Sequence, residues 1–523
     1  MRITNNVIMR NTKTNINTNK LNVNDMNNQM SSQKKIALPS DDPVIAVRAL
    51  RLRSNLGELD QYLNTNIEQA DSWLDITETA ISNISSLLNK IYDCCVQGAN
   101  DTLNQDDRNA ILAQLKQNQD QIYAEGNTDY AGRTVFTGYK TNAPLTYTKD
   151  SPDDHYKIDQ RLSFEDMQEN RYVFNEVTNS DITNYDNGTT VDYASDKDPG
   201  YATINRIRLA YDKITSTVDS STTPPTLNCD AKIYEIGADG KVTTNEITYK
   251  PVTTEMLEKC GYDLSALGTG TDVALNVDTG ELLFSDSKAS DIKTNTKQFQ
   301  ITYDKKGFAK GDLTPEDYFN CRKYNDPDPN PEKNYIHIDE TGKWITEGIN
   351  YTVAINQEFT INIEAKDVMN QDVGRDVTDL ANAVQAAIDA HDKVTKLESM
   401  LKNENLTDVQ KEKLNALLNR ANKEATYTDD TMRDMFTRYV GVFKDYINTA
   451  ELARTDVGSR GDRLMMTKNR VEAQYNTIDK LKAENEDADL SDIVIDYQAS
   501  YLAYQASLQA AAKVQQQTLL DYI

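Results

Sequence analysis

The sequence predicts an α+β protein: an elongated α-helical bundle or coiled coil built from both chain ends, with a β-rich domain inserted in the middle. Helical spacing of apolar residues is concentrated near the two ends of the 523 residues, whereas Thr, Tyr, Ile and Val alternate between turn signals in the middle. The hydrophobic fraction is 38%, and 28 Tyr stand against 10 Phe and 2 Trp. A large part of the chain is therefore expected to be solvated or to form half-exposed seams.

We expect five parts along the chain. They are an N-terminal arm that is disordered or coiled-coil (1–40), the first part of a helical bundle (41–144), an inserted β-rich outer domain (145–365), the second part of the bundle (366–485) and a C-terminal coiled-coil arm (486–523).

A long helix is predicted after residue 40. From Ile45 to Ile91 apolar residues recur at steps of three and four, and Thr77 alone interrupts the series. This narrow stripe is typical of a coiled-coil or bundle seam. One pair of steps, from Leu59 through Leu63 to Ile67, is four and four, which makes an eleven-residue repeat and relaxes a left-handed supercoil there.

The ends of the front helices are marked by capping residues. Ser40 or Asp42 can cap the first long helix, Pro43 fits its first turn, and Gly98 is placed to end it. A second helix is expected from Asn104 to Gly126, followed by a hairpin with Gly132 at its turn. In the middle, the expected hairpin turns are Asp239-Gly240, Asp278-Thr279-Gly280, Lys306-Gly307 and Thr341-Gly342. Helical spacing returns near Val377 and continues to the end of the chain.

Each end of the chain carries an apolar stripe that it cannot bury alone. One apolar residue per heptad in the Asn-rich N-terminal arm cannot offset its ordering entropy, so this arm should become helical only against a partner. We predict an assembly interface made by the two stripes: Met9, Ile16, Val23 and Met30 at the front, and Tyr497, Tyr501, Tyr504, Leu508, Ala511 and Leu519 at the back.

Charge and hydropathy exclude several classes of partner. The net charge is −26, although residues 1–38 carry six basic residues and one acid, so we expect no binding to nucleic acid. No cleavable signal peptide and no apolar run of about 18 residues is visible, so no membrane insertion is expected. Five scattered cysteines form no disulfide framework.

The residues that would carry catalysis are not grouped in the sequence. His155, His337 and His391 lie in different segments, and the usual metal, nucleophile and phosphate-binding motifs are missing. The acid pairs Asp41-Asp42 and Asp106-Asp107 stand where helices begin, so capping explains them. We predict no enzymatic activity, no cofactor and no metal site.

The two ends together resemble the flagellin-like proteins of bacterial flagella. The matching segments are MRIT at 1–4, SSQKK at 31–35, PSDDP at 39–43, RALRLR at 48–53, WLD at 73–75, QGANDT at 97–102, NTDYAGRTVFTG at 127–138, DVGSR at 456–460 and SDIVIDYQASYLAYQASLQAAA at 491–512. The motif positions carried over are Ser40, Asp41, Asp42, Pro43, Gly132, Arg133, Gly138, Gly458 and Arg460. Gln33 departs from the pattern, because relatives usually have Gly there, and the turn after the arm is expected to differ.

This resemblance implies an architecture, a location and partners. It implies paired terminal arms, an adjoining bundle and an outward insert, in a structural subunit that forms a ring between hook and filament. The implied partners are further copies of the chain, a neighbouring hook-associated protein, flagellin and an export chaperone. The implied location is the extracellular flagellum, reached by export without a cleaved signal peptide.

Two other functions stay open. Flagellin itself has the same physical design, and only the SDDP segment and the GRTVFTG hairpin favour the junction subunit over it. A secreted adhesin or glycan-binding protein acting through the insert is the third reading. Gly458 and the nearby Gly461 fit either a local bend or a close approach of subunits.

Overall fold

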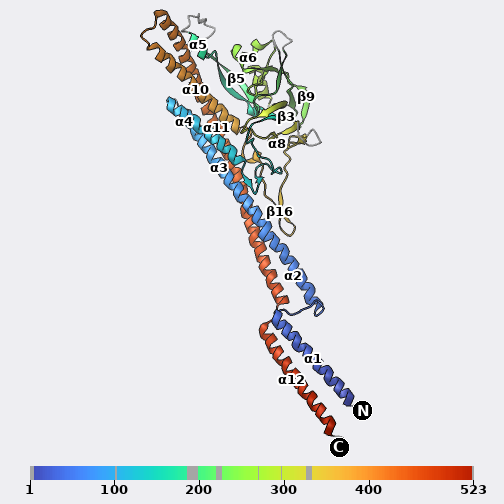
Figure 1. Ribbon diagram of the computed structural model, residues 1–523. Helices are drawn as coiled ribbons and strands as arrows, with labels where there is room; N and C mark the ends of the chain where they lie inside the picture. Colours follow the sequence, from blue (N-terminus) through green and yellow to red (C-terminus); the bar gives the residue numbers. More distant parts are fainter. Residues whose placement is uncertain are drawn as a thin grey trace. The chain divides into compact units, whose positions relative to one another are not determined.

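The structure, a computed structural model, describes residues 5–100, 103–184, 198–219, 226–268, 270–295, 297–324 and 333–520. The predicted fold class is confirmed: the chain is α+β, with long helices at both ends and a β-rich region between them (Figure 1). The chain divides into two compact units. The first consists of Met1–Ser72, Asn350–Phe359 and Gly461–Ile523, and the second of Trp73–Ile349 and Thr360–Arg460.

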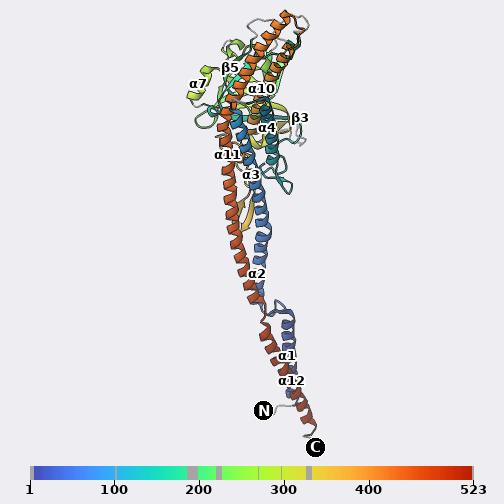
Figure 2. The ribbon, with the colours of Figure 1, turned by 90° about the vertical axis from the view of Figure 1, so that its left-hand side faces the viewer.

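The first unit contains the two ends of the chain. Helix α1 (Asn5–Ser32) and helix α12 (Leu490–Leu520) lie side by side and run in opposite directions (Figures 1 and 2). The predicted N-terminal arm is thus helical here because α12 of the same chain lies against it, and its disorder when unpaired stays a prediction. The unit also holds α2 (Pro43–Gln61), the π-helical turn η1 (Tyr62–Ile67), the start of α3 (Glu68–Gly98) and the last part of α11 (Asp408–Glu486).

The π-helical turn lies at the irregular step of the apolar seam. The four–four step from Leu59 to Ile67 predicted a local change of supercoil, and the helix accommodates it by changing its hydrogen-bond pattern at Tyr62–Ile67. The hairpin of β16 (Asn350–Ala354) and β17 (Gln357–Thr360) contacts this turn, and the Asn66 side-chain amide donates a hydrogen bond of 2.7 Å to the carbonyl oxygen of Thr352. Residues 350–359, which sequence alone placed in the insert, therefore belong with the terminal helices.

Four long helices form most of the α-helical part described in the second unit. They are the rest of α3, α4 (Gln105–Gly126), α10 (Val373–Leu401) and the first part of α11. The predicted stops and caps are confirmed: α3 ends at Gly98, and Asn104 caps α4 in a reciprocal capping box with Asp107. The largest buried side chains of this part are Trp73, Ile81, Ile84, Phe436, Tyr439 and Phe443.

Two sheets make up most of the β-rich region of the second unit. The five-stranded sheet has the order β10 (Lys250–Val252), β11 (Val273–Asn276), β12 (Glu281–Phe284), β5 (Gly200–Arg208) and β4 (Gln168–Phe174). The six-stranded sheet has the order β15 (Lys333–Tyr335), β14 (Asn320–Tyr324), β3 (Ser151–Ser163), β13 (Gln298–Phe308), β8 (Lys232–Ile236) and β9 (Val242–Glu246). Within these sheets β10 and β11 are parallel, and the other described pairs are antiparallel.

Shorter elements surround the sheets. They are the β1–β2 hairpin (Asp129–Tyr130, Arg133–Thr134), the β6–β7 pair (Ser216–Asp219, Thr226–Cys229), the helices α5 (Asn179–Asn184), α6 (Thr254–Lys259), α7 (Asp286–Thr294), α8 (Pro315–Tyr318) and α9 (Ala365–Val368), and the 3-10 turns η2 (Phe164–Asp166) and η5 (Leu264–Leu267).

Two of the four predicted hairpin turns join paired strands in the structure, and one of the four predictions is wrong. Those at Asp239-Gly240 and Asp278-Thr279-Gly280 are confirmed, since they join β8 to β9 and β11 to β12. Thr341-Gly342 turns the chain, but only one bridge, Ile338 with Trp344, flanks it. The prediction of a turn at Lys306-Gly307 is wrong. Strand β13 continues through these residues, and its register against β3 shifts there. A glycine in a strand marks a bulge as readily as a turn.

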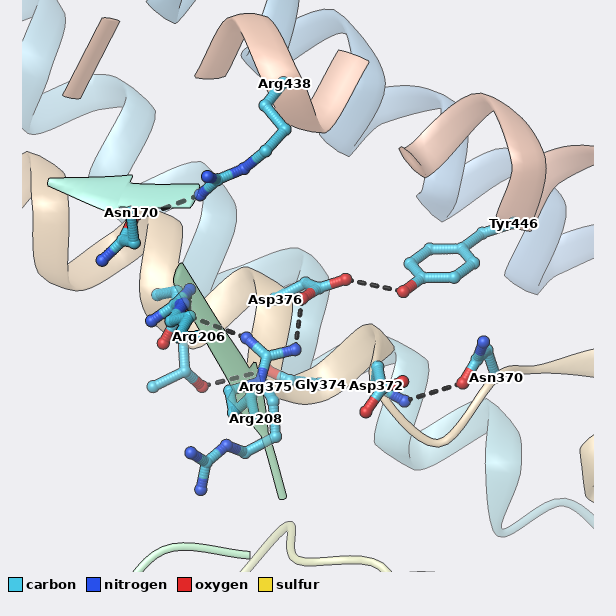
Figure 3. A network of polar contacts seen from close by, with 12 residues as sticks. Asn170, Arg206, Arg208, Asn370, Asp372, Gly374, Arg375, Asp376, Arg438 and Tyr446 are labelled. Carbon is cyan, nitrogen blue, oxygen red and sulfur yellow. Dashed lines mark hydrogen bonds and ion pairs between the residues drawn. The ribbon is translucent and has the colours of Figure 1, made fainter. Parts of the chain in front are cut away.

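Buried charged side chains join the five-stranded sheet to α10 and α11 within the second unit. Asp376 of α10 is fully enclosed; it accepts one bond from the Arg208 guanidinium of β5 and another, 2.6 Å long, from the Tyr446 hydroxyl of α11 (Figure 3). Asp379, one turn further along α10, accepts bonds of 2.7 Å from both Arg206 and Arg208. Burial would raise the pKa of Asp379, but the two guanidinium groups outweigh it and hold this pKa well below its usual range.

Candidate assembly surface

The turn between α1 and the following segment has a backbone conformation that favours glycine. Gln33 has a φ of 57°, in the left-handed region that costs a non-glycine residue roughly 1 kcal/mol or more. Its carbonyl oxygen accepts a bond of 3.0 Å from the Ala488 amide, so the strained residue is tied to the start of α12. The chain thus keeps, with Gln, a left-handed turn at the position where the resembled proteins usually have Gly.

A buried glutamate fixes this turn to the end of α11. The side chain of Glu486 is 4% exposed, and both its oxygens accept from the Arg53 guanidinium of α2, one of them at 2.7 Å. Lys34 lies 3.6 Å from Glu486 and also pairs with Asp487. The hydrogen bonds from Arg53 lower the pKa of Glu486. The Glu486 carboxylate at the end of α11 therefore lies between two cations, Arg53 of α2 and Lys34 of the turn after α1, and joins these three segments.

The predicted apolar stripe of α12 is divided between two faces of the helix. The partly or fully buried positions recur at steps of four and three, and they are Ile493, Tyr497, Ser500, Tyr504, Ser507 and Ala511. The other predicted members stay exposed: Tyr501 and Leu508 are each 42% accessible. Tyr497 and Tyr501 stack on each other across the boundary, with ring centroids 6.1 Å apart. Leu519 lies in α12 beyond the part whose side chains the structure describes.

The stripe of α1 faces α12 through most of its length. Ile16, Val23 and Met30 are partly buried, whereas Met9 near the start of the helix is half exposed. Asn19 lies on the same face, and its amide donates a bond of 3.3 Å to the carbonyl oxygen of Ala503. The predicted α1 stripe therefore packs against only half of the predicted α12 stripe.

A second exposed apolar row on α2 was not anticipated. Val44, Val47 and Leu50 are 72%, 50% and 64% accessible and recur at steps of three on one side of the helix. They lie off the predicted seam, which contains Ile45 and Ala49. The signal was present in the sequence, because Val44 and Leu50 stand next to seam positions and Val47 lies between two of them, so the apolar residues form a broader face than the seam alone.

The acidic motif before α2 works as a cap. The Asp42 carboxylate accepts from the backbone amides of Val44 and Ile45, at 2.9 and 3.2 Å, and Pro43 occupies the first turn. Asp41 instead accepts from the amide of Leu38, at 2.8 Å, and shapes the preceding turn. Of the two predicted cap residues, Asp42 and not Ser40 is the one used.

The second motif forms a tight hairpin beside Trp73. Ala131 and Gly132 both have positive φ, as a two-residue turn of this kind requires, and Asp129 accepts a bond of 2.9 Å from the Gly132 amide. The Arg133 guanidinium lies over the Trp73 ring, 5.2 Å from its centroid. Gly138, with a φ of 58°, ends the motif where the neighbouring residue, Thr137, bridges to Glu364.

The third motif lies in the middle of α11. The helix is continuous from Asp408 to Glu486, so Gly458 and Gly461 form no loop. Apart from the adjacent backbone of its own helix, a Cβ atom added at either glycine would meet no described atom within 4 Å. Arg460 extends from the same helix and donates a bond of 3.0 Å to the carbonyl oxygen of Asn362. The two glycines therefore leave surface that no described residue covers.

The three histidines occupy separate surroundings. His155 lies 3.6 Å from Asp304, His391 shares Asp429 with Arg108, and the His337 ring contacts the carbonyl oxygen of Glu316. Across the described ranges no three His, Cys, Asp or Glu side chains are grouped so that they could hold a metal ion. In the same part of the chain, no helix combines the length and the apolar character needed to cross a bilayer.

The described part of the chain thus pairs a helix from each end and leaves apolar rows of α2 and α12 exposed. Residues 3–141 match the family described as the bacterial flagellin N-terminal helical region. The resemblance to flagellin-like proteins is confirmed.

Two curated relatives make the comparison more particular. The chain is 33% identical over 116 residues to flagellar hook-associated protein 3 of Salmonella typhimurium, covering 22% of this chain and 36% of that protein. It is 32% identical over 123 residues to flagellar hook-associated protein 3 of Escherichia coli, covering 23% and 38%. The match thus spans less than two-fifths of either relative.

The chain also resembles a solved structure. The crystal structure of flagellar hook-associated protein-3 from Legionella pneumophila aligns with 83% of this chain and 97% of its own, with a TM-score of 0.28 and 10% identity.

Proposed function

We propose that this chain is a non-catalytic structural subunit of the bacterial flagellum, which forms a ring at the hook–filament junction and links a hook-associated protein to the filament. The names of the two curated relatives and the flagellin-like N-terminal region support this proposal. The further partners we propose are other copies of the chain, flagellin and an export chaperone. Its location would be the extracellular flagellum.

The observation that carries the proposal is the uncovered half of the α12 stripe. Leu490, Val494, Tyr501 and Leu508 are 49%, 36%, 42% and 42% accessible beside the row that faces α1. Exposed apolar rows of this regularity are expected to be covered in an assembly, since burial contributes roughly 25 cal/mol per Å². In our proposal neighbouring subunits cover this row, and the row of Val44, Val47 and Leu50 on α2 forms a second contact.

The five-part division of the chain belongs to the same proposal. The arms 1–40 and 486–523 would form the inner contacts, 41–144 and 366–485 the adjoining helical layer, and 145–365, apart from the hairpin residues 350–359, the outward part. The open surface at Gly458 supports the close approach of another subunit over the alternative of a bend in the chain.

A pair of charge substitutions on adjacent residues tests the proposal. We expect Leu508→Glu to leave the soluble subunit folded, because Leu508 contacts solvent already, but to abolish its incorporation between hook and filament. Gln509→Glu places the same charge on the next residue of the helix, which is also exposed, and should be incorporated normally. The readout is the amount of each variant in purified hook–filament structures and the swimming of the cells. Normal incorporation of Leu508→Glu would falsify the role of this row.

Flagellin is the second candidate, favoured by the match to the flagellin N-terminal region. Antibody labelling of intact flagella separates the two. A single band at the base of each filament is expected for the junction subunit, whereas labelling along the whole filament would identify flagellin. In a strain that lacks the gene, we expect hooks from which filament protein escapes into the medium without being retained.

A further inference from the structure

The second unit contains a cavity that the assembly proposal does not use. Its volume is about 300 Å³, and it lies between residues 136–140, α8 and residues 334–347. This volume is at the lower end of the range for sites that bind small organic molecules. The walls come from segments that are distant in the sequence, so no local sequence motif predicts the cavity.

Asp317 of α8 lines this cavity with an incompletely satisfied carboxyl group. Its Oδ2 atom is enclosed and has no hydrogen-bond partner among the described residues. Burial raises the pKa of Asp317 well above its usual value. An enclosed acceptor without a donor is unfavourable, because it has lost its hydrogen bonds to water and gained none in exchange. The carboxyl group therefore lacks the cation or donor that would compensate it.

The nearest lysine is already engaged. The Lys140 ammonium lies 2.7 Å from the Glu316 carboxylate, which also accepts a bond of 2.6 Å from the Tyr156 hydroxyl. The same ammonium lies 3.2 Å from the centroid of the Tyr335 ring. Glu316 is thus satisfied by its own partners, and Asp317 is not.

Three further side chains of the wall present acceptor atoms. Glu364 pairs with Lys366 at 2.6 Å, and the Glu347 side chain is exposed. His337 directs Nε2 at the carbonyl oxygen of Glu316, which can only accept, so this nitrogen carries the proton. Burial lowers the pKa of His337, which keeps the ring neutral and leaves Nδ1 as an acceptor. The cavity is lined by three carboxyl-bearing side chains, Asp317, Glu347 and Glu364, and by one ammonium, that of Lys140.

The arrangement suits an extended organic cation better than a metal ion. Calcium needs six to eight oxygen ligands around one point, and the described carboxylates are not grouped in that way. Ile336 and Ile345 add exposed apolar surface to the wall, 62% and 42% accessible, against which a short aliphatic chain can pack. A molecule with a donor-rich charged group at each end of such a chain would match both features.

We propose that this cavity binds an aliphatic organic cation, a primary ammonium or guanidinium compound, with its charged group at Asp317 and its methylene groups against Ile336 and Ile345. The proposal concerns a single folded chain, so its success or failure is separate from that of the assembly role.

Agmatine, which carries a guanidinium and an ammonium on a four-carbon chain, is the probe. Binding to the full chain is measured by titration calorimetry and by tryptophan fluorescence. Trp344 lies near the cavity, because the Lys366 ammonium that pairs with Glu364 is 5.1 Å from its ring centroid, whereas Trp73 is fully buried. We expect saturable binding that weakens with salt, and a fluorescence change that Trp344→Phe removes while the calorimetric signal remains.

Three variants decide the outcome. Asp317→Asn keeps the shape of the side chain and should weaken binding at least tenfold, and Glu347→Gln, on an exposed residue, should weaken it several-fold without affecting folding. Asp367→Asn is the matched control, because this half-exposed carboxylate pairs with the same Lys366 but does not line the cavity. The proposal is overturned if the wild-type chain shows no saturable binding, if Asp317→Asn and Glu347→Gln bind as the control does, or if neutral n-butanol binds as well as agmatine.

Discussion

Replacing Asp376 with Asn removes one negative charge from the buried network that joins the sheet to the helices in the second unit. The substitution keeps the size of the side chain and one acceptor oxygen. Asp376 is 1% exposed and accepts from Arg208 of β5 and from Tyr446 of α11. After the change, the Arg208 guanidinium would keep only Asp379, which it shares with Arg206, whereas Arg206 also pairs with the buried Glu281.

The expected loss of stability can be worked from these contacts. Removing one member of a buried ion pair costs about 3–5 kcal/mol, and a hydrogen bond to a charged group contributes about 1.5–3 kcal/mol. Because Asn retains one acceptor and Asp379 still holds Arg208, we expect a loss near the lower end, about 3 kcal/mol. This corresponds to roughly a hundredfold change in the opening equilibrium, at about 1.4 kcal/mol per factor of ten.

Hydrogen exchange followed by mass spectrometry is the suitable assay, because a chain of two compact units need not unfold in one step. We expect protection in β5 and β12 to fall about a hundredfold in Asp376→Asn, with little change in α1. Asp389→Asn, on the exposed side of the same helix, serves as the control and should change protection by less than about 0.5 kcal/mol. A loss below about 1 kcal/mol for Asp376→Asn would refute the view that this network holds the sheet on the helices.

Three further outcomes follow from single residues. Burial raises the pKa of Asp372 to about 7, so its carboxyl group contributes to stability below the unfolded value near 4 and that contribution is lost as pH rises towards 7. Asp372→Asn should therefore be more stable than wild type by up to about 4 kcal/mol at pH 8 and nearly equal to it at pH 4, measured by urea unfolding. Gln33→Gly should stabilise the α1–α12 pair by about 0.5–1 kcal/mol, since the left-handed φ is relieved, and slower exchange of α1 amides would register it, whereas unchanged or faster exchange would count against it. Gly458→Ala should raise the thermal stability of the isolated chain by about 1 kcal/mol, because the added methyl meets nothing, and yet lower its incorporation into flagella; undiminished incorporation would exclude close subunit approach there.

Much of the helical architecture was predictable because its signal is local. The stripe from Ile45 to Ile91, the cap at Asn104 and the stop at Gly98 each depend on residues within one helix. The prediction at Lys306-Gly307 was wrong because a glycine with positive φ serves a turn and a bulge equally well, and only the partner strand β3 decides between them.

The candidate surfaces depend on contacts that a single sequence does not contain. The C-terminal stripe was broad enough for two faces, and the choice of Tyr504 over Tyr501 as the partly buried residue is made by the position of α1. The cavity at Asp317 was missed for a related reason. Its wall combines residues near 138, 317 and 336, and no periodicity connects them.

The π-helical turn at Tyr62–Ile67 has a consequence for how the length of this chain can vary. Each of its hydrogen bonds spans one residue more than an α-helical bond, so the turn stores an additional residue within the helix. Deleting the exposed Thr65 would let the segment close as ordinary α-helix, with the residues on either side keeping their faces. The same deletion at Asn55, in regular helix, would rotate every preceding side chain by about 100° relative to those that follow. Shortened relatives should therefore have lost their residue at this turn.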